Sequence, residues 1–113
     1  MSIEAIPEPA VTIHDLTGFQ RDLLIALGRH EALHNHYPHG LAIKDQISER
    51  YDEEIHHGRL YPNLDALVDL DLVEKSERDK RTNAYALTPE GSYVLRTYAQ
   101  WLTTSLNGGE ADD

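Results

Sequence analysis

One stretch of the chain decides its fold, and it reads HGRLYPNLDALVDLDLVEKSERDKRTNAYALTPEG over residues 57–91. Its first part predicts an amphipathic helix over 57–70, because apolar residues return there at the three- and four-residue spacing of one helix face. These apolar residues are Leu60, Leu64, Leu67, Val68 and Leu72. The three leucines Leu60, Leu64 and Leu67 are expected to lie in the core.

Two β-type runs and another helix follow this first helix. The runs cover 72–75 and 82–87, and they flank a charged tip at 76–81. Thr88 is then expected to cap a helix that begins at Pro89, where the missing N–H of proline costs no hydrogen bond. A helix, a charged hairpin and a helix in this order predict a winged helix-turn-helix, mainly α with a small β-wing.

Two more helices are predicted upstream. Thr17 and Gln20 have the spacing of a capping box, which opens a helix that ends near Leu33. Its buried stripe is expected to comprise Phe19, Leu23, Leu24, Leu27 and Ala32. The next helix is predicted over 40–51, with inward-facing residues Leu41, Ile43, Ile47 and Tyr51. Residues 54–56 are expected to add a short edge strand to the wing.

The pattern divides the chain into four parts. Residues 1–16 form an N-terminal arm, punctuated by proline and expected to be extended, with apolar residues available to dock on a partner helix. Those residues are Ile3, Ile6, Val11 and Ile13. Residues 17–88 form the winged helix-turn-helix domain, 89–107 a C-terminal helix, and 108–113 an acidic tail that is expected to be disordered.

Composition excludes several classes of protein. At 113 residues the chain has the size of one domain. It has no apolar run long enough to cross a bilayer and no start that resembles a signal peptide, so a cytoplasmic protein is expected. The absence of cysteine excludes disulfides, thiolate catalysis and thiol redox sensing. Histidines cluster at 30–39, but no cysteine accompanies them, so neither a metal nor a cofactor is expected.

The charge balance admits two interpretations. Twenty acidic residues face ten basic ones, which gives a formal net charge of −10. DNA-binding proteins are usually basic because they neutralise phosphates, so the acidity favours a protein-binding or ligand-binding role. Alternatively, the acidity is typical of a halophilic cytoplasm, where molar salt screens the repulsion between carboxylates. Scarce lysine and the lack of acids over residues 56–64 favour the second interpretation.

Candidate DNA-binding residues lie mainly on the predicted recognition helix, 57–70, and on the wing. They are Lys44, His57, Arg59, Tyr61, Asn63, Lys75, Arg78, Lys80, Arg81 and Asn83. Arg59 and Asn63 are the candidate base readers, because arginine pairs with guanine and asparagine with adenine in the major groove. The wing cations suit a phosphate backbone or a narrow minor groove. The alternatives are a solvated helix start and an ordinary charged hairpin.

Several motifs agree in order and spacing with one protein family. GRLYPNL at 58–64, LVEK at 72–75 and NAYALTPEG at 83–91 closely resemble the PadR-like transcription regulators, and HGLAIK at 39–44 resembles the opening of that family's second helix. The resemblance covers residues 17–100 and points to regulators of halophilic archaea. It implies a winged helix that binds DNA. Asp71 stands where the family usually has glycine.

The last helix carries an apolar stripe that is too extensive for a helix facing solvent. It consists of Val94, Leu95, Tyr98, Trp101, Leu102 and Leu106. The resemblance implies that the C-terminal helix makes a dimer, so these residues are the expected interface and 89–107 is the dimerisation helix. The alternative is that the stripe packs against the first helix of its own chain.

The expected function is therefore that of a homodimeric regulator that binds double-stranded DNA at a pseudo-palindromic operator, is adapted to high salt and takes up inorganic ions. The alternative is a winged-helix protein-interaction module without DNA readout, which the fold alone does not exclude. An enzyme is not expected, because no nucleophile–base pair, phosphate-binding loop or pair of catalytic carboxylates stands out.

Overall fold

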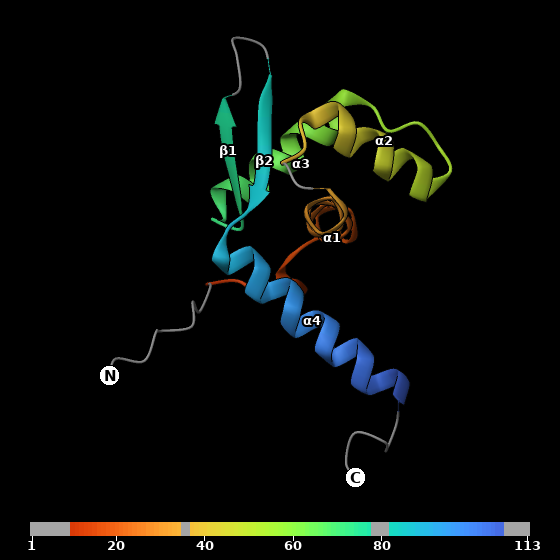
Figure 1. The fold of residues 1–113 in the computed structure, drawn as a ribbon, viewed down its shortest axis with the longest axis vertical. Coiled ribbons are helices and arrows are strands. Elements are labelled where there is room, and N and C mark those ends of the chain that lie inside the picture. The colour runs from red at the N-terminus through yellow and green to blue at the C-terminus, as the bar shows by residue number, and fades with distance from the viewer. Residues whose placement is uncertain (1–9, 35–36, 78–81, 108–113) are drawn as a thin grey trace.

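The computed structural model describes residues 10–34, 37–77 and 82–107, and its elements follow the predicted order (Figure 1). A short 3-10 helix and three helices come first: η1 (Ile13–Asp15), α1 (Gly18–Leu33), α2 (Gly40–Tyr51) and α3 (His57–Asp69). The wing and the last helix follow: β1 (Val73–Glu77), β2 (Asn83–Leu87) and α4 (Pro89–Asn107). The protein is a winged helix, mainly α with a small antiparallel sheet, as the sequence predicts.

Helix α1 begins with the predicted capping box. The Thr17 hydroxyl accepts a hydrogen bond from the Gln20 amide at 3.1 Å, and the Gln20 side chain accepts one from the Thr17 amide at 3.1 Å. Four of the five residues in the predicted stripe are buried, but Ala32 is exposed and His30 is buried in its place. The prediction for Ala32 is wrong because two residues turn a helix by about 200°, which puts Ala32 nearly opposite His30.

Helix α2 has the predicted bounds and buries Ile43 and Ile47. Tyr51 is half-buried against the core, but Leu41 is 54% exposed, so its inward placement is wrong. The reason is again angular, because Leu41 stands two residues before Ile43 and so points to nearly the opposite side of the helix. The helix ends at Tyr51, and the backbone of its C-cap residue, Asp52, turns into the left-handed region with a φ of 57°.

The wing is a two-stranded antiparallel hairpin in which Val73 pairs with Leu87 and Glu77 with Asn83. Residues 54–56 do not join it, so the predicted edge strand is wrong. The Ile55 amide instead donates to the Ser48 hydroxyl at 3.0 Å, which ties this segment back to α2. The edge of β2 is met by the segment before α2, where the Tyr85 amide donates to the Pro38 carbonyl at 2.9 Å.

The turn between α3 and β1 is locked to the start of α4. Asp71 takes a φ of 64°, a left-handed conformation that suits the glycine usual at this position in the family that the sequence resembles. Its carbonyl accepts a hydrogen bond from the Thr88 hydroxyl at 2.6 Å, and that hydroxyl accepts one from the Gly91 amide at 2.9 Å. Thr88 is therefore the predicted cap of α4. A Cβ at Gly91 would overlap the carbonyl of Leu72.

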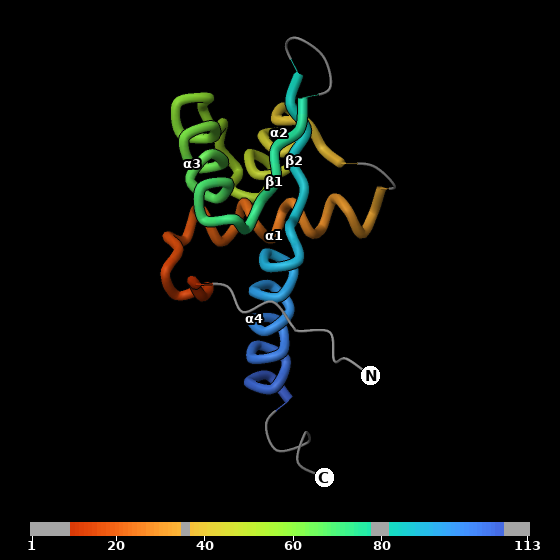
Figure 2. The backbone as a smooth tube through the Cα atoms, turned by 90° about the vertical axis from the view of Figure 1, so that its left-hand side faces the viewer, coloured from red at the N-terminus to blue at the C-terminus, as the bar shows by residue number. Residues whose placement is uncertain are grey.

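The core lies where α1, α2 and α3 meet the inner face of the wing. Leu60, Leu64 and Leu67 are fully buried, as predicted, and Tyr85 of β2 and Val94 of α4 complete the same cluster. Figure 2 shows α4 leaving the body at the end opposite the wing. None of the helices in the described ranges is long and apolar enough to cross a membrane.

The part of the N-terminal arm that the structure describes packs on its own chain. Ile13 is buried in η1, and Val11 packs against the core. Thr12 and Asp15 form a capping box around η1, since the Asp15 carboxylate accepts from the Thr12 amide at 2.8 Å. The expectation of an extended arm is therefore wrong for residues 13–15. The acidic tail at 108–113 lies outside the described residues.

Candidate nucleic-acid interface

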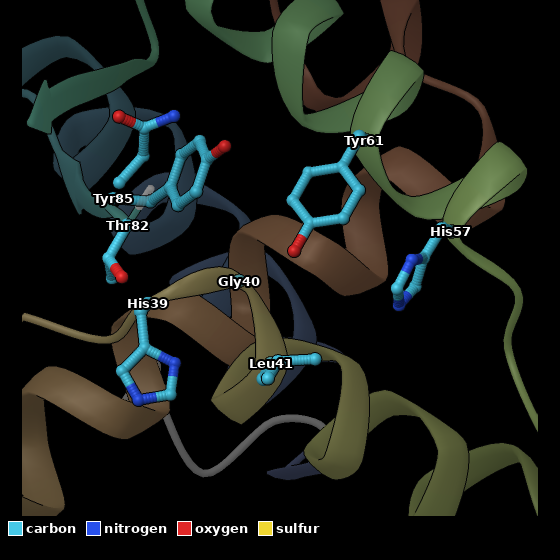
Figure 3. A pocket seen from close by; sticks show the side chains of 8 residues that line it. His39, Gly40, Leu41, His57, Tyr61, Thr82 and Tyr85 are labelled. Atoms are coloured by element: carbon cyan, nitrogen blue, oxygen red, sulfur yellow. The ribbon is translucent and has the colours of Figure 1, made fainter. Parts of the chain in front are cut away.

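Helix α3 presents three surfaces around its buried leucines. Gly58, Pro62 and Asp65 follow one another at helical spacing along the outward face, where Gly58 and Pro62 are exposed. His57 and Tyr61, one turn apart, lie on the flank toward the start of α2, as Figure 3 shows. The predicted recognition helix thus has an outward face of small and acidic side chains, and it carries its polar aromatic side chains to one side.

A hollow of about 470 Å³, here named the wing hollow, opens beside that flank (Figure 3). It is lined by residues that α2, α3 and the wing bring together: His39, Gly40, Leu41, His57, Tyr61, Thr82, Asn83 and Tyr85. The lining includes imidazole, phenol, hydroxyl and amide groups, all of which can donate hydrogen bonds. The three predicted site residues found here are His57, Tyr61 and Asn83.

Tyr61 reaches the first turn of α2 because residue 40 is glycine. A Cβ at Gly40 would collide with the Tyr61 hydroxyl and ring. The ring of His57 meets that of Tyr61 edge-on, with centroids 5.6 Å apart. The Tyr61 hydroxyl therefore lies beside the positive end of the α2 dipole, where backbone amides and a phenol can meet one anion.

Tyr85 forms the inner end of the wing hollow. Burial raises the pKa of its phenol, and the Asp65 carboxylate raises it further, while a hydrogen bond with the Asn83 side chain acts in the opposite direction. The net effect keeps Tyr85 neutral, as a hydrogen-bond donor, at pH values where an unperturbed tyrosine begins to ionise.

Sequence reasoning missed five lining residues, Gly40 and four residues with larger side chains. His39 and Leu41 belong to the HGLAIK run, which predicts only a helix opening with Leu41 turned inward. Thr82 and Tyr85 belong to the wing, where Tyr85 counts mainly as a core residue. The useful signal is Gly40, because a glycine at a helix start indicates close approach of another group.

The two predicted base readers lie on the flank of α3 away from the wing hollow. The Arg59 guanidinium stands over the ring of Phe19 and pairs with Glu53. The Asn63 amide donates to the Arg59 carbonyl at 2.7 Å and accepts from Gln20 at 3.1 Å. Both side chains are engaged within the protein, so the structure does not place them with His57 and Tyr61.

The remaining predicted cations are either paired or outside the described residues. The Lys44 side chain is 16% exposed, and its ammonium lies 3.6 Å from a Glu54 carboxylate oxygen. Lys75 of β1 lies 3.3 Å from Asp65 on the outward face of α3, so that pair joins the wing to the recognition helix. Arg78, Lys80 and Arg81 lie outside the described residues.

The predicted dimer stripe of α4 divides into two parts. Val94 is 2% exposed and belongs to the core of its own chain, which is why it is unavailable to a partner. Leu95 and Tyr98 pack partly on the same core. Trp101 is 58% exposed and Leu106 85% exposed, with Leu102 between them also exposed. The outer half of the stripe therefore remains open to a partner.

One family and several solved structures match this chain. The family described as transcriptional regulator PadR-like matches residues 31–97. A complex structure of RosR from Halobacterium salinarum, RosR-S1, is 50% identical, with a TM-score of 0.75 over 88% of this chain and 83% of that one. A second RosR structure from this organism, grown from NaBr, is 51% identical. Its TM-score is 0.73 over 87% of this chain and 83% of that one.

A more distant structure shares the fold alone. It is a PadR-like transcription factor from Bacteroides fragilis, 24% identical, with a TM-score of 0.52 over 76% of this chain and 85% of that one. The comparison with curated proteins gave no match. Because the family match spans more than half of the 113 residues and the RosR structures share about half of its sequence, the chain belongs to the PadR-like family of transcriptional regulators.

Proposed function

We propose that this transcription regulator binds double-stranded DNA as a homodimer, with the DNA backbone against the wing hollow. The observation that carries the proposal is the chemistry of that hollow. None of its lining residues is acidic, although the chain has a net charge of −10, and three separate elements supply its hydrogen-bond donors. PadR-like regulators bind DNA and are not enzymes.

The wing hollow suits a phosphate held by neutral donors. Tyr61, His57 and Asn83 line the hollow and carry a hydroxyl, an imidazole and an amide. A helix N-terminus carries roughly half a positive charge and attracts anions without a lysine. Such contacts fix the position of the protein on the duplex but do not read the bases.

The outward face of α3 is the surface that we assign to the major groove. Gly58 and Pro62 project little bulk there, so the helix can approach the edges of the bases closely. Leu41, exposed at the rim of the wing hollow, offers an apolar contact of the kind that recognises a thymine methyl group. Lys75, next to Asp65, joins the wing to this surface.

The exposed outer half of α4 supports the proposed homodimer. Trp101, Leu102 and Leu106 expose a large apolar surface at the end of the molecule away from the wing. Pairing two such helices about a twofold axis would remove that surface from water and leave both wing hollows free. Twofold symmetry in the protein implies a pseudo-palindromic operator, with half-sites about one helical turn of 34–36 Å apart or a multiple of it.

We further propose that the protein works in a halophilic cytoplasm and takes up inorganic cations on DNA. The acidic composition and the RosR structures from Halobacterium salinarum support this setting. Cations held between surface carboxylates and phosphates would offset the repulsion between two acidic partners.

The deciding experiment compares Tyr61→Phe with Tyr93→Phe, the same loss of a hydroxyl on α4. Anisotropy titrations of a labelled operator would give both dissociation constants at one salt concentration. The operator is first selected from a pool of genomic fragments by its affinity for the wild-type protein. Tyr61→Phe should weaken binding by about 1.5–3 kcal/mol, the range for a hydrogen bond to a charged group, and Tyr93→Phe should bind like wild type.

Two results would count against this assignment. Equal affinities for the two variants would remove Tyr61 from the interface. A dimeric wild-type protein that selects no fragment and has no affinity for any duplex would contradict the proposed function. It would support the alternative, a protein-interaction module without DNA readout.

A further inference from the structure

We propose that Arg59 is a positioning residue, whose guanidinium fixes the start of α3 against α1 and α2 and so sets the angle at which the outward face of α3 meets DNA. The inference rests on the proposed DNA binding. It replaces the expectation that Arg59 reads a base.

The guanidinium of Arg59 has partners on three separate segments. Its central carbon lies 4.0 Å from the ring centroid of Phe19 at the start of α1 and 5.7 Å from that of Tyr51 at the end of α2. One of its nitrogens lies 3.9 Å from a carboxylate oxygen of Glu53, just after α2. A cation held over aromatic faces is attracted by their quadrupoles. We name these four residues the arginine clamp.

The two rings of the arginine clamp are themselves fixed. Phe19 is buried, and its centroid lies 5.9 Å from that of Tyr51, with the planes at 73°. The Tyr51 hydroxyl donates to the Asp22 carboxylate at 2.6 Å, and burial and that hydrogen bond both raise the pKa of the Tyr51 phenol. Arg21 pairs with the other oxygen of Asp22 at 3.3 Å. Packing and hydrogen bonds therefore hold the two rings that Arg59 contacts in place.

A second tie lies one turn further along the same flank of α3. Asn63 donates from its amide nitrogen to the Arg59 carbonyl at 2.7 Å, and its amide oxygen accepts from Gln20 at 3.1 Å. Gln20 is also the residue that completes the capping box with Thr17. Bidentate reading of adenine needs both ends of an asparagine amide, and both ends of Asn63 are already used.

Helix α3 needs such external support because its first turn is weakly held from within. Pro62 lies inside the helix and has no N–H, so the Gly58 carbonyl lacks its usual helical partner. His56, the N-cap residue, makes no side-chain hydrogen bond that caps the helix. The contacts of the arginine clamp hold the same turn through the side chain of Arg59.

The arginine clamp lies on the flank of α3 where it would control the tilt of the helix. Arg59 and Asn63 lie on one flank of α3, and His57 and Tyr61 lie on the other, beside the wing hollow. A change of tilt at the clamp would shift Gly58 and every other outward contact together. Losing a base reader, in contrast, changes recognition at one base pair. The two roles therefore give different patterns of affinity across altered operators.

The experiment uses three variants of the full chain. Arg59→Ala removes the clamp. Arg59→Lys keeps the positive charge and the aliphatic stem but loses the planar group that stacks on the rings. Arg50→Ala, on the exposed side of α2, is the control for loss of one arginine. Each is titrated against the operator, against operators with one base pair changed at a time, and against a random duplex, all at one salt concentration.

Arg59→Ala is expected to bind the operator about two- to fivefold more weakly than Arg50→Ala, the range for a cation–π contact at a half-exposed site. Arg59→Lys should behave nearly like Arg59→Ala, and the loss should be the same for every altered operator. Hydrogen exchange at the amides of Leu60 and Tyr61 should speed up in both Arg59 variants and stay unchanged in Arg50→Ala.

Loss of discrimination at one base pair alone, or wild-type binding by Arg59→Lys, would overturn the proposal and restore Arg59 as a base reader or a simple cation. If the wild type binds no duplex, the proposed function fails, and hydrogen exchange then decides whether the clamp holds α3. Arg59→Lys keeps the positive charge and the aliphatic stem, so it serves as the folded variant should Arg59→Ala melt early.

Discussion

At the scale of single residues, two glycines near the wing hollow differ in the space that is available for a side chain. Gly40 has no room for a side chain, because a Cβ there would collide with the Tyr61 hydroxyl. Gly58 has open space, since nothing lies within 4 Å of an added Cβ. Gly40 therefore serves contact within the protein. Gly58, on the outward face of α3, leaves open space there.

We predict that Gly40→Ala and Gly58→Ala have opposite effects on stability. Gly58→Ala should stabilise the fold by up to about 1 kcal/mol, because alanine loses less backbone entropy than glycine in a helix. Gly40→Ala should destabilise it and displace Tyr61. Thermal unfolding of both variants checks this, and operator binding should fall in both. A Gly40→Ala protein as stable and active as wild type would show that Tyr61 can leave the first turn of α2 without cost.

At the scale of elements, periodicity predicted the helices and the hairpin well, because the core face of each is a repeated apolar pattern. It failed for Leu41 and Ala32, which are apolar but lie away from the core face. Only the angle around the helix decides whether such a residue is buried. Periodicity also failed for residues 54–56, because the bond between Ile55 and Ser48 is a tertiary contact with no local pattern.

The site was harder to predict than the fold. Arg59 and Asn63 have suitable chemistry for bases, but whether they face DNA depends on the rings and amide that α1 and α2 place beside them. The sequence shows none of these partners at short range. Gly40 next to His39 was the local sign of the wing hollow.

At the scale of elements, our prediction concerns the exposed apolar residues of α4. Trp101→Ala with Leu102→Ala should convert the proposed dimer to monomers, because large-to-small changes in an apolar interface cost about 2–5 kcal/mol each. Both side chains are exposed in the single chain, so the fold should survive. Sedimentation equilibrium measures the assembly state. Leu33→Ala, an exposed leucine at the end of α1, is the control. A double variant that stays dimeric would place the interface on another surface.

At the scale of the whole molecule, four cations among the described residues are paired with acids. Lys44, Arg59, Lys75 and Arg21 each lie within 4 Å of a carboxylate oxygen. Each such surface pair contributes only about 0–1 kcal/mol and weakens as salt screens it. These four cations are therefore poor counterparts for phosphates at low salt, while the wing hollow offers neutral donors that salt screens less.

This arrangement predicts an unusual dependence on salt. Counterion release makes the binding of an ordinary regulator fall steeply with salt, with a log–log slope of about −0.9 for each phosphate neutralised. Here the net charge of −10 opposes binding to DNA, and the proposed uptake of cations between carboxylates and phosphates would oppose that release. Folding and specific binding should persist at molar KCl, with a slope far shallower than the ten basic residues imply.

A titration from about 0.1 M to several molar KCl, with binding and thermal melting followed together, measures both effects. At the low end, repulsion among acids such as Asp65, Asp69 and Asp71 should lower the melting temperature and loosen the dimer. Tyr61→Phe should lose affinity by a similar factor at every salt concentration, because a neutral hydroxyl releases no counterion. A protein fully stable at low salt whose binding falls steeply as KCl rises would contradict the halophilic adaptation, since its contacts would then be those of an ordinary cationic DNA binder.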